Sequence, residues 1–172
     1  PFTPLALAPI TCPWSTPPVL ENMLAADPAL SNALGCASGT PARFAGAAQV
    51  FQSGTMYYLD GAPRSIYVLT IDGHYRRFDD TWVQGVDPDS AGEIPPPGLI
   101  EPIRGFGKVW RTNADVRASL GWAITNEMGD TATVEYFERG RAIYLPVRGE
   151  TIILAEDPGG QSGVWRAISG GF

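Results

Sequence analysis

The chain contains two copies of one pattern, and this duplication limits its possible folds more than any other feature. A shift of 86 residues places LGCA at 34–37 on LGWA at 120–123, and FQSG at 51–54 on FERG at 137–140. Self-similarity of this kind is typical of repeated structural units, each of which buries its apolar face against a neighbour.

Further matches extend the repeat towards the end of both copies. Tyr58 falls on Tyr144 without a gap, and one deletion then brings IYVL at 66–69 beside TIIL at 151–154. Trp82 and Trp165 are expected to close the two copies as core residues. The order of these matches makes chance similarity a poor explanation.

Each copy is expected to begin with two short helices, the second of which is marked by its caps. Asp27 precedes Pro28, a residue favoured at the first helical position, and Gly35 follows as a stop signal. In the second copy, Asn113 and Gly121 hold the corresponding positions. The apolar segments that predict the first helix of each pair lie at 19–24 and 106–110.

The pattern then changes to short runs rich in aromatic and β-branched residues, separated by Gly, Asp and Pro turns. The runs lie at 48–53, 55–60, 65–71 and 74–79 in copy one, and at 133–138, 141–147, 150–156 and 163–168 in copy two. Each copy should therefore form a four-stranded antiparallel meander. An isolated meander has one apolar face, which the helices or the other copy must cover.

These elements predict a mostly β fold with short helices (α+β), in which two tandem copies of a helix plus a four-stranded meander pack as one pseudo-symmetric body. Copy one, with a disulfide-stapled leader, is expected to span 1–84, and copy two 103–172. The Pro-rich connector 85–102 contains PPP at 95–97, which predicts an extended polyproline segment. Apolar residues indicate that the connector packs along the surface: Ile94, Leu99 and Ile100.

Two cysteines, Cys12 and Cys36, lie near the start of the chain. Paired, they would close a loop that contributes about 3 kcal/mol of stability in the chain-entropy description. A disulfide indicates an oxidising compartment, and therefore a secreted or cell-surface protein. The alternative is a pair of buried free thiols.

The acidic balance of the chain excludes several classes of partner. The net charge is −6, and the tightest basic pair is Arg76-Arg77, whereas phosphate backbones require clustered Lys and Arg. We therefore expect no nucleic-acid partner and no anionic membrane partner. No run of 18 apolar residues is present, so no membrane insertion is expected.

The chain opens with the apolar segment PFTPLALAPI at 1–10. Its prolines and its lack of a basic region make it a poor signal peptide, and we interpret it as the start of a mature or excised fragment. Self-assembly by donation of this segment as a strand to a neighbour is one hypothesis for its role.

The order LG-x-A, F-x-x-G, aliphatic-Tyr, strand and closing Trp resembles the LGFP repeat of secreted actinobacterial proteins. Copy two carries the resemblance better, through LGWA at 120–123, Glu127, YFERG at 136–140, Ile143-Tyr144 and Trp165. The chain departs from the family at four positions: Ala37 and Ala123, where Pro is usual, and Tyr58 and Tyr144, where the aromatic pair usually ends in Trp. The family is thought to tether proteins to the cell wall.

A second resemblance covers nearly the whole chain. The segment RGFGKVWR at 104–111, leading into LGWA at 120–123, resembles uncharacterised C-terminal modules of large extracellular proteins from Chloroflexi-type bacteria. Together the two resemblances imply a secreted, non-catalytic module of the cell envelope or surface.

No arrangement of residues predicts catalysis or a cofactor. The one histidine, His74, lies at a turn and does not recur in copy two, so that an exposed turn residue is the simplest interpretation. Glycoside hydrolysis needs two carboxyls facing one cleft. Glu127, Glu135 and Glu138 are the candidates, but Glu135 and Glu138 should point to opposite faces of a strand. We therefore expect no enzyme activity, no catalytic residue and no cofactor.

Metal binding has little support in the sequence. Zinc needs three or four His, Cys or carboxylate ligands, which one His and two paired Cys do not supply. A calcium ion held by loop carboxylates remains an alternative to simple solvated turns. The residues concerned are Asp72, Asp79, Asp80, Asp87 and Asp89, and they form no EF-hand pattern.

Aromatic residues are the remaining candidates for a binding surface, because their faces stack on sugars. Those that recur in both copies are expected to lie in the core. Tyr57, Tyr75 and Trp122 break the repeat, and we predict that these are the exposed ligand-binding residues.

Three functions follow from these observations. The first is a non-catalytic extracellular module that binds cell-wall or other carbohydrate at the cell envelope, with a glycan as partner. The second is a structural or protein-interaction subunit of a surface appendage or large surface protein. The third is a carboxylate-dependent glycoside hydrolase. The resemblance to the LGFP repeat favours the first.

Overall fold

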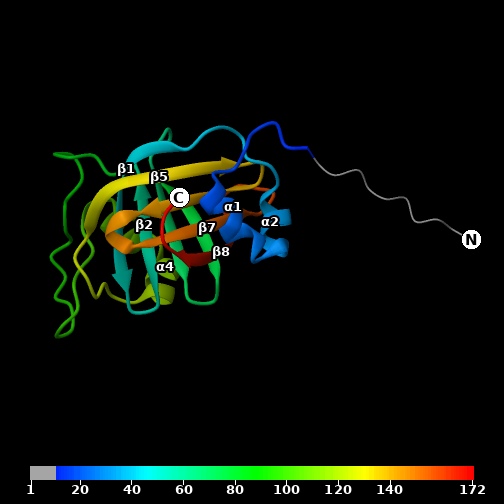
Figure 1. The fold of residues 1–172 in the computed structure, drawn as a ribbon. Helices are drawn as coiled ribbons and strands as arrows, with labels where there is room; N and C mark the ends of the chain where they lie inside the picture. Colours follow the sequence, from blue (N-terminus) through cyan, green and yellow to red (C-terminus); the bar gives the residue numbers. More distant parts are fainter. Residues whose placement is uncertain (1–10) are drawn as a thin grey trace, which may run out of the picture.

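Eight antiparallel strands close into one barrel in the computed structural model, which describes residues 11–172 (Figure 1). The segment 1–10, and with it the hypothesis of strand donation, lies outside the described residues. The strands are β1 (Ala42–Phe51), β2 (Gly54–Leu59), β3 (Ser65–Thr70), β4 (His74–Asp79), β5 (Met128–Phe137), β6 (Gly140–Leu145), β7 (Glu150–Glu156) and β8 (Ser162–Ser169). The helices are α1 (Pro18–Ala25), α2 (Pro28–Leu34), α3 (Arg104–Thr112), α4 (Ala114–Leu120) and the 3-10 turn η1 (Pro146–Arg148).

A mostly β fold with short helices is confirmed, but the prediction of two separate meanders is wrong. The strand order is β1-β2-β3-β4-β8-β7-β6-β5, so each copy supplies four adjacent strands of one barrel. β1 pairs with β5, and β4 pairs with β8. A four-stranded meander has two edges of unpaired N–H and C=O groups, and joining the edges of both copies pairs them.

The strand β1 begins six residues earlier than the sequence pattern predicted. Its first half, from Ala42 to Ala48, pairs with β5 from Val134 back to Met128. Ala and Gly dominate this half, and they carry no strand signal because they present little side chain to a pleated surface. The missed residues are those that join the two copies.

Each helical pair packs on the strands of the other copy. Leu20, Leu24, Leu30 and Leu34 of α1 and α2 form one core cluster with copy-two residues: Phe137, Ala142, Ile153 and Ala155. Phe106, Trp110, Val116 and Leu120 of α3 and α4 form the equivalent cluster with copy-one residues: Ala47, Phe51, Met56, Ile66 and Val68. Figure 1 shows the blue helices α1 and α2 lying beside β7 of copy two. The two copies are therefore interlocked.

The interior of the barrel is a third, packed core. Its fully buried members come from seven of the eight strands: Ala48, Tyr57, Leu59, Tyr67, Leu69, Tyr75, Ala132, Val134, Ile143, Leu145, Ile152 and Leu154. Side chains rather than a ligand cavity fill small eight-stranded barrels of this kind.

The structure explains the F-x-x-G part of the repeat. A Cβ atom on Gly54 would lie 2.2 Å from the carbonyl oxygen of Leu69, and one on Gly140 would lie 2.0 Å from that of Leu154. These contacts are too close for any side chain. Equivalent glycines thus make equivalent backbone contacts in the two copies.

The predicted cap of α2 is confirmed, because the Asp27 side chain accepts a hydrogen bond of 3.0 Å from the Leu30 amide. The corresponding prediction for Asn113 is wrong. Its side-chain amide donates to the Val109 carbonyl at 2.8 Å, which closes the end of α3 instead of capping α4.

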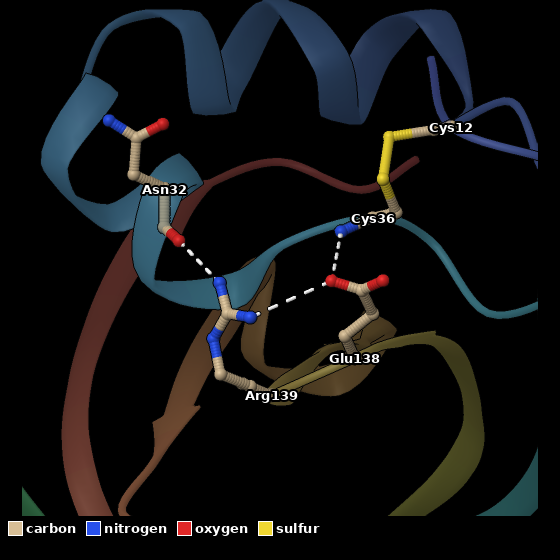
Figure 2. Close-up of a disulfide and its surroundings, with 5 residues drawn as sticks. All are labelled: Cys12, Asn32, Cys36, Glu138 and Arg139. Carbon is tan, nitrogen blue, oxygen red and sulfur yellow. Dashed lines mark hydrogen bonds and ion pairs between the residues drawn. A yellow bond between two sulfur atoms is a disulfide. The ribbon is translucent and has the colours of Figure 1, made fainter. Parts of the chain in front are cut away.

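The predicted disulfide between Cys12 and Cys36 is confirmed (Figure 2). Next to it, the Cys36 amide donates to Oε2 of Glu138 at 3.3 Å, and Arg139 donates to the Asn32 carbonyl at 2.7 Å. The disulfide therefore fastens the leader to a segment that the β5–β6 turn of copy two already holds.

The connector is tied to the helices of copy two by its acidic residues. Lys108 donates to Asp87 at 2.9 Å, and Arg117 forms a two-pronged ion pair with Glu93 at 2.8 and 2.6 Å. Ile100 packs on the α3–α4 core, as expected, whereas Ile94 is 93% exposed and the prediction that it packs is wrong. Ion pairs of its carboxylates, rather than apolar contacts along its length, hold this segment.

Candidate functional site

The strongest candidate site is a groove beside the first residue of α3. Two pockets of about 180 and 290 Å³ adjoin there and share Arg104 and Glu127 in their walls. We call the pair the α3 groove. The first pocket is also lined by Tyr58, Arg64, Ile66, Asp80, Trp82, Gly105 and Phe106. The second is also lined by Gln49, Ile100, Glu101, Ile103 and Asn126.

The loop that follows β4 brings Trp82 to this groove. Asp80, whose side chain is 8% exposed, accepts a hydrogen bond of 3.0 Å from the Trp82 amide and lies 3.8 Å from Arg64. Arg64 also donates to the Trp82 carbonyl at 3.2 Å. Asp80 and Arg64 thus neutralise each other and fix the loop.

Arg104 has an unusual backbone. Its φ is +50°, and within residues 11–172 it is the one residue other than glycine with positive φ. Its amide donates to the Asp89 carbonyl of the connector at 2.7 Å. Left-handed backbone costs an L-residue about 1–2 kcal/mol and is concentrated at functional sites. Among the described residues, its guanidinium has no hydrogen-bond or ion-pair partner.

Glu127 lines both pockets of the α3 groove together with Arg104. Burial of the carboxyl group raises the pKa of Glu127 above its ordinary value; Asp80 adds to this shift, and Arg104 opposes it. A carboxyl group with a raised pKa takes up a proton at a higher pH than an ordinary one, and its protonated form donates a hydrogen bond.

Two buried polar groups in the walls of the groove lack partners in the described part of the chain. Gln49 is 2% exposed, and its Nε2 donates to the Thr125 carbonyl at 3.0 Å, but its Oε1 accepts nothing. The indole N–H of Trp82 is also buried without an acceptor. Buried polar groups are usually paired, so an orphan donor and an orphan acceptor in one groove are a signal of binding.

Tyr58 supplies a half-buried aromatic wall. Its hydroxyl donates to Asp60 at 3.1 Å, and burial together with this bond raises the pKa of Tyr58 to about 12. The group therefore stays a neutral phenol at physiological pH.

The duplication provides an internal control for the charges of the groove. The alignment of the two copies pairs each charged residue with Pro or Gly: Arg104 with Pro18, Glu127 with Pro41, Arg64 with Gly149, and Asp80 with Gly170. The counterpart positions belong to the same strands and helical pairs, and the fold forms there without these charges. The fold does not require them, so a binding role explains them better than a structural role.

Two other clefts differ from the α3 groove because they are equivalent to each other in the two copies. One lies between α2 and the β7–β8 turn and includes Ala33 and Asp157. The other lies between α4 and the β3–β4 turn and includes the equivalent residues Ser119 and Asp72. Because this cleft occurs in both copies, the shape of the fold accounts for it.

The structure does not bring the predicted binding residues to the α3 groove. Tyr57 and Tyr75 are each 2% exposed inside the barrel, so the prediction that they are exposed is wrong. The Tyr57 hydroxyl donates to Glu150 at 2.7 Å, and the ring of Tyr75 lies 6.2 Å from that of Tyr67. Both rings act as core residues, and neither face is available to a sugar.

Trp122 is half-buried outside the barrel. Its ring lies 4.9 Å from that of Trp110, and the Arg117 guanidinium covers both rings at 5.3 and 4.0 Å. Because Glu93 holds Arg117, this stack connects the connector to α3 and α4. Neither α3-groove pocket includes Trp122.

Strand register explains why Tyr75 was misread. Tyr75 pairs with Leu69 on β3, and Trp165 pairs with Leu154, the equivalent of Leu69, on β7. Tyr75 and Trp165 are therefore counterparts, and the alignment of Trp82 with Trp165 is wrong. Trp82 lies beyond β4, in the loop that reaches the groove. A sequence signal for the site did exist, in the charged residues that replace Pro18 and Pro41.

Other sequence candidates lie elsewhere. His74 is exposed, as expected, and its Nδ1 is 3.4 Å from Asp72. Glu135 is fully buried, and Glu138 lies at the β5–β6 turn. Within residues 11–172, no group of three or more His, Cys, Asp or Glu is placed to hold a metal ion. Likewise, no helix in this part of the chain has the length and apolarity to cross a membrane.

Comparison of the chain with protein-family models, with curated proteins and with solved structures found no match. The resemblance to the LGFP repeat therefore stays a prediction. The geometry of the α3 groove is therefore the basis for a functional proposal.

Proposed function

We propose that this protein is a non-catalytic, extracellular module that binds carbohydrate of the cell envelope in the α3 groove. The observation that carries the proposal is the set of charged groups in the groove whose counterparts are Pro or Gly. Aromatic walls from Tyr58 and Trp82 accompany donors and acceptors at Arg104, Glu127 and Gln49 that lack full pairing within the described residues. Sugars offer apolar ring faces and hydroxyls that both donate and accept, which suits such a lining.

The size and chemistry of the groove support a small polar ligand. A pocket of about 180 Å³ lies below the ~300–1,000 Å³ of sites for drug-sized molecules. It fits one sugar ring, and the adjoining pocket of about 290 Å³ offers space for a second unit. The disulfide supports an extracellular setting, because such bonds persist in oxidising compartments.

A pull-down against insoluble polysaccharides and bacterial cell walls tests this function. We expect the protein to be retained and Trp82→Ala to lose retention, because the substitution removes an aromatic wall. Trp14→Ala is the matched control, since Trp14 is 49% exposed in the leader and does not line the groove. Failure of the protein to bind any glycan, or equal losses in both variants, would contradict the proposal.

Glycoside hydrolysis is the second candidate, because Asp80 and Glu127 line the same pocket. Two carboxyls in one pocket, of which Glu127 has a raised pKa, are the groups that acid catalysis of this reaction uses. The Trp82 amide and Arg64 already engage Asp80, which argues against its service as a nucleophile or base. Release of reducing sugar from a retained glycan, abolished by Glu127→Gln, would favour the hydrolase.

A further inference from the structure

Arg104 is the residue of the α3 groove that most constrains the class of ligand. Its left-handed backbone is held by the Asp89 carbonyl of the connector, and its guanidinium is unpaired within the described residues. The counterpart in the other copy, Pro18, begins the same kind of helix with no such backbone and no charge. A strained residue that the fold does not need is expected to serve the ligand.

The other groups around Arg104 define what the ligand must offer. The buried N–H of Trp82 needs an acceptor, and a guanidinium offers paired N–H donors in one plane. Two coplanar acceptor oxygens, as in a carboxylate, match that fork better than a single hydroxyl does.

Charge balance is consistent with an anionic group at this end of the groove. Of the nearby charges, Asp80 is paired with Arg64, and Glu101 lies 3.6 Å from Arg111. That leaves Arg104 and Glu127. Because burial raises the pKa of Glu127, its carboxyl is more readily neutralised than an ordinary one, and it then donates to an anion instead of repelling it.

We infer that the ligand of the α3 groove is an acidic sugar whose carboxylate is bound by the Arg104 guanidinium, with Trp82 and Glu127 in the same pocket. This inference rests on the proposed function, since it names the class of carbohydrate. The charged and titratable groups that line the two pockets with Glu127 are Arg104 from α3, Asp80 from the loop after β4, Arg64 before β3, Tyr58 from β2 and Glu101 from the connector, which lies 3.6 Å from Arg111. Tyr58 stays neutral, and Asp80 and Arg64 offset each other. Affinity should therefore rise as the pH falls towards the range where Glu127 takes up a proton.

Ligand-observed NMR with matched sugars tests the inference. The probes are glucuronate, galacturonate and mannuronate, their methyl esters, and glucose, galactose and mannose, each titrated to millimolar concentration. We expect at least one acid to bind roughly tenfold or more tightly than its ester and its parent, because a charge-assisted hydrogen bond is lost with the carboxylate. Equal binding of acid, ester and parent would overturn the inference and leave carbohydrate binding in place. No binding by any of the nine sugars would overturn both.

Substitutions of Arg104 distinguish a specific role of its guanidinium in the preference for the acid from a general effect of positive charge. Arg104→Gly keeps the fold, because glycine accepts the left-handed backbone, and it should remove the preference for the acid. Arg104→Lys keeps the charge but not the fork, and should recover only part of it. Arg43→Ala is the control, since Arg43 is exposed on β1 and does not line the groove. An acid preference that persists in Arg104→Gly would refute the role of this residue.

Glu127→Gln provides the second readout. The variant is neutral at every pH, so its affinity for the acid should change little as the pH falls below neutrality, while that of the unchanged protein should rise. The same pH dependence in both proteins would refute the participation of Glu127.

Discussion

Replacing Glu135 by Gln should stabilise the protein at neutral pH. Glu135 is fully buried on β5, and both of its carboxylate oxygens lack a partner among the described residues. Its counterpart in copy one is Gln49, whose amide donates to the Thr125 carbonyl at 3.0 Å. A glutamine at 135 would have the same opportunity with the carbonyl of Gly39, the counterpart of Thr125.

The sign of the pH effect follows from burial. Burial raises the pKa of Glu135 in the folded state above the 4.5 of an ordinary Glu. Below about pH 4.5 the carboxyl is protonated in both states, so ionisation has no effect on stability. As the pH rises further, the unfolded chain gives up this proton more easily, and the folded state loses up to about 1.4 kcal/mol per pH unit until its own pKa is passed.

The expected magnitude combines the two effects. An unsatisfied buried polar group costs about 1–3 kcal/mol, so Glu135→Gln should gain about 2 kcal/mol at pH 7 and clearly less at pH 4. For a chain of this length, 2 kcal/mol raises the Tm by about 4–8 °C. Gln49→Glu is the matched control and should show the opposite behaviour, with a loss at pH 7 that shrinks at pH 4.

Thermal and urea unfolding of the oxidised protein, followed by tryptophan fluorescence at pH 4 and pH 7, would measure these differences. The reasoning fails if Glu135→Gln changes stability equally at the two pH values. It also fails if the variant is less stable than the parent protein at pH 7.

Three further predictions concern the scaffold. Fragments 1–84 and 85–172 should each be unfolded alone, because each helical pair packs on the strands of the other copy, and the mixture should recover the circular dichroism signal of β-strands. A fragment that folds independently would contradict the interlocked core. Gly140→Ala should lower the free energy of unfolding, measured in urea, by about 3 kcal/mol, since its Cβ would lie 2.0 Å from the Leu154 carbonyl oxygen. Gly149 has open space around it, so Gly149→Ala should lower this free energy by about 1 kcal/mol. Cys12→Ser combined with Cys36→Ser should cost about 3 kcal/mol, and the same loss should follow reduction of the unchanged protein but not of the variant.

The local signals of the sequence predicted the elements well and their assembly poorly. The cap at Asp27, the stop at Gly35 and the turn glycines act within a few residues, and such contacts leave a readable pattern. Closure of the barrel depends on β1 meeting β5 through Ala and Gly positions, which carry no pattern of their own. Each helical pair could cover the strands of its own copy or those of the other copy. The apolar faces of the two sets of strands are equivalent, so hydrophobic periodicity does not distinguish the two arrangements.

The site was missed for a related reason. The idea that binding residues break the repeat was sound, but the aromatic residues were compared in the wrong register. Tyr75 corresponds to Trp165, and both belong to the barrel interior. The informative differences between the copies are Arg104 and Glu127, which align with Pro18 and Pro41. These differences became visible only when the start of each helix and strand was known.

The two copies also show why a groove forms on one side of the barrel only. Beyond β8, Gly171 lies so close to Tyr144 that a Cβ atom would be 2.5 Å from the ring. The counterpart of Gly171 beyond β4 is Thr81, whose side chain forbids that approach to Tyr58, and Lys108 binds the Thr81 carbonyl at 2.9 Å. The chain beyond β4 therefore cannot approach Tyr58 as Gly171 approaches Tyr144, and a pocket of about 180 Å³ lies beside Tyr58. One difference in side-chain size thus separates a packed surface from a binding groove on the same scaffold.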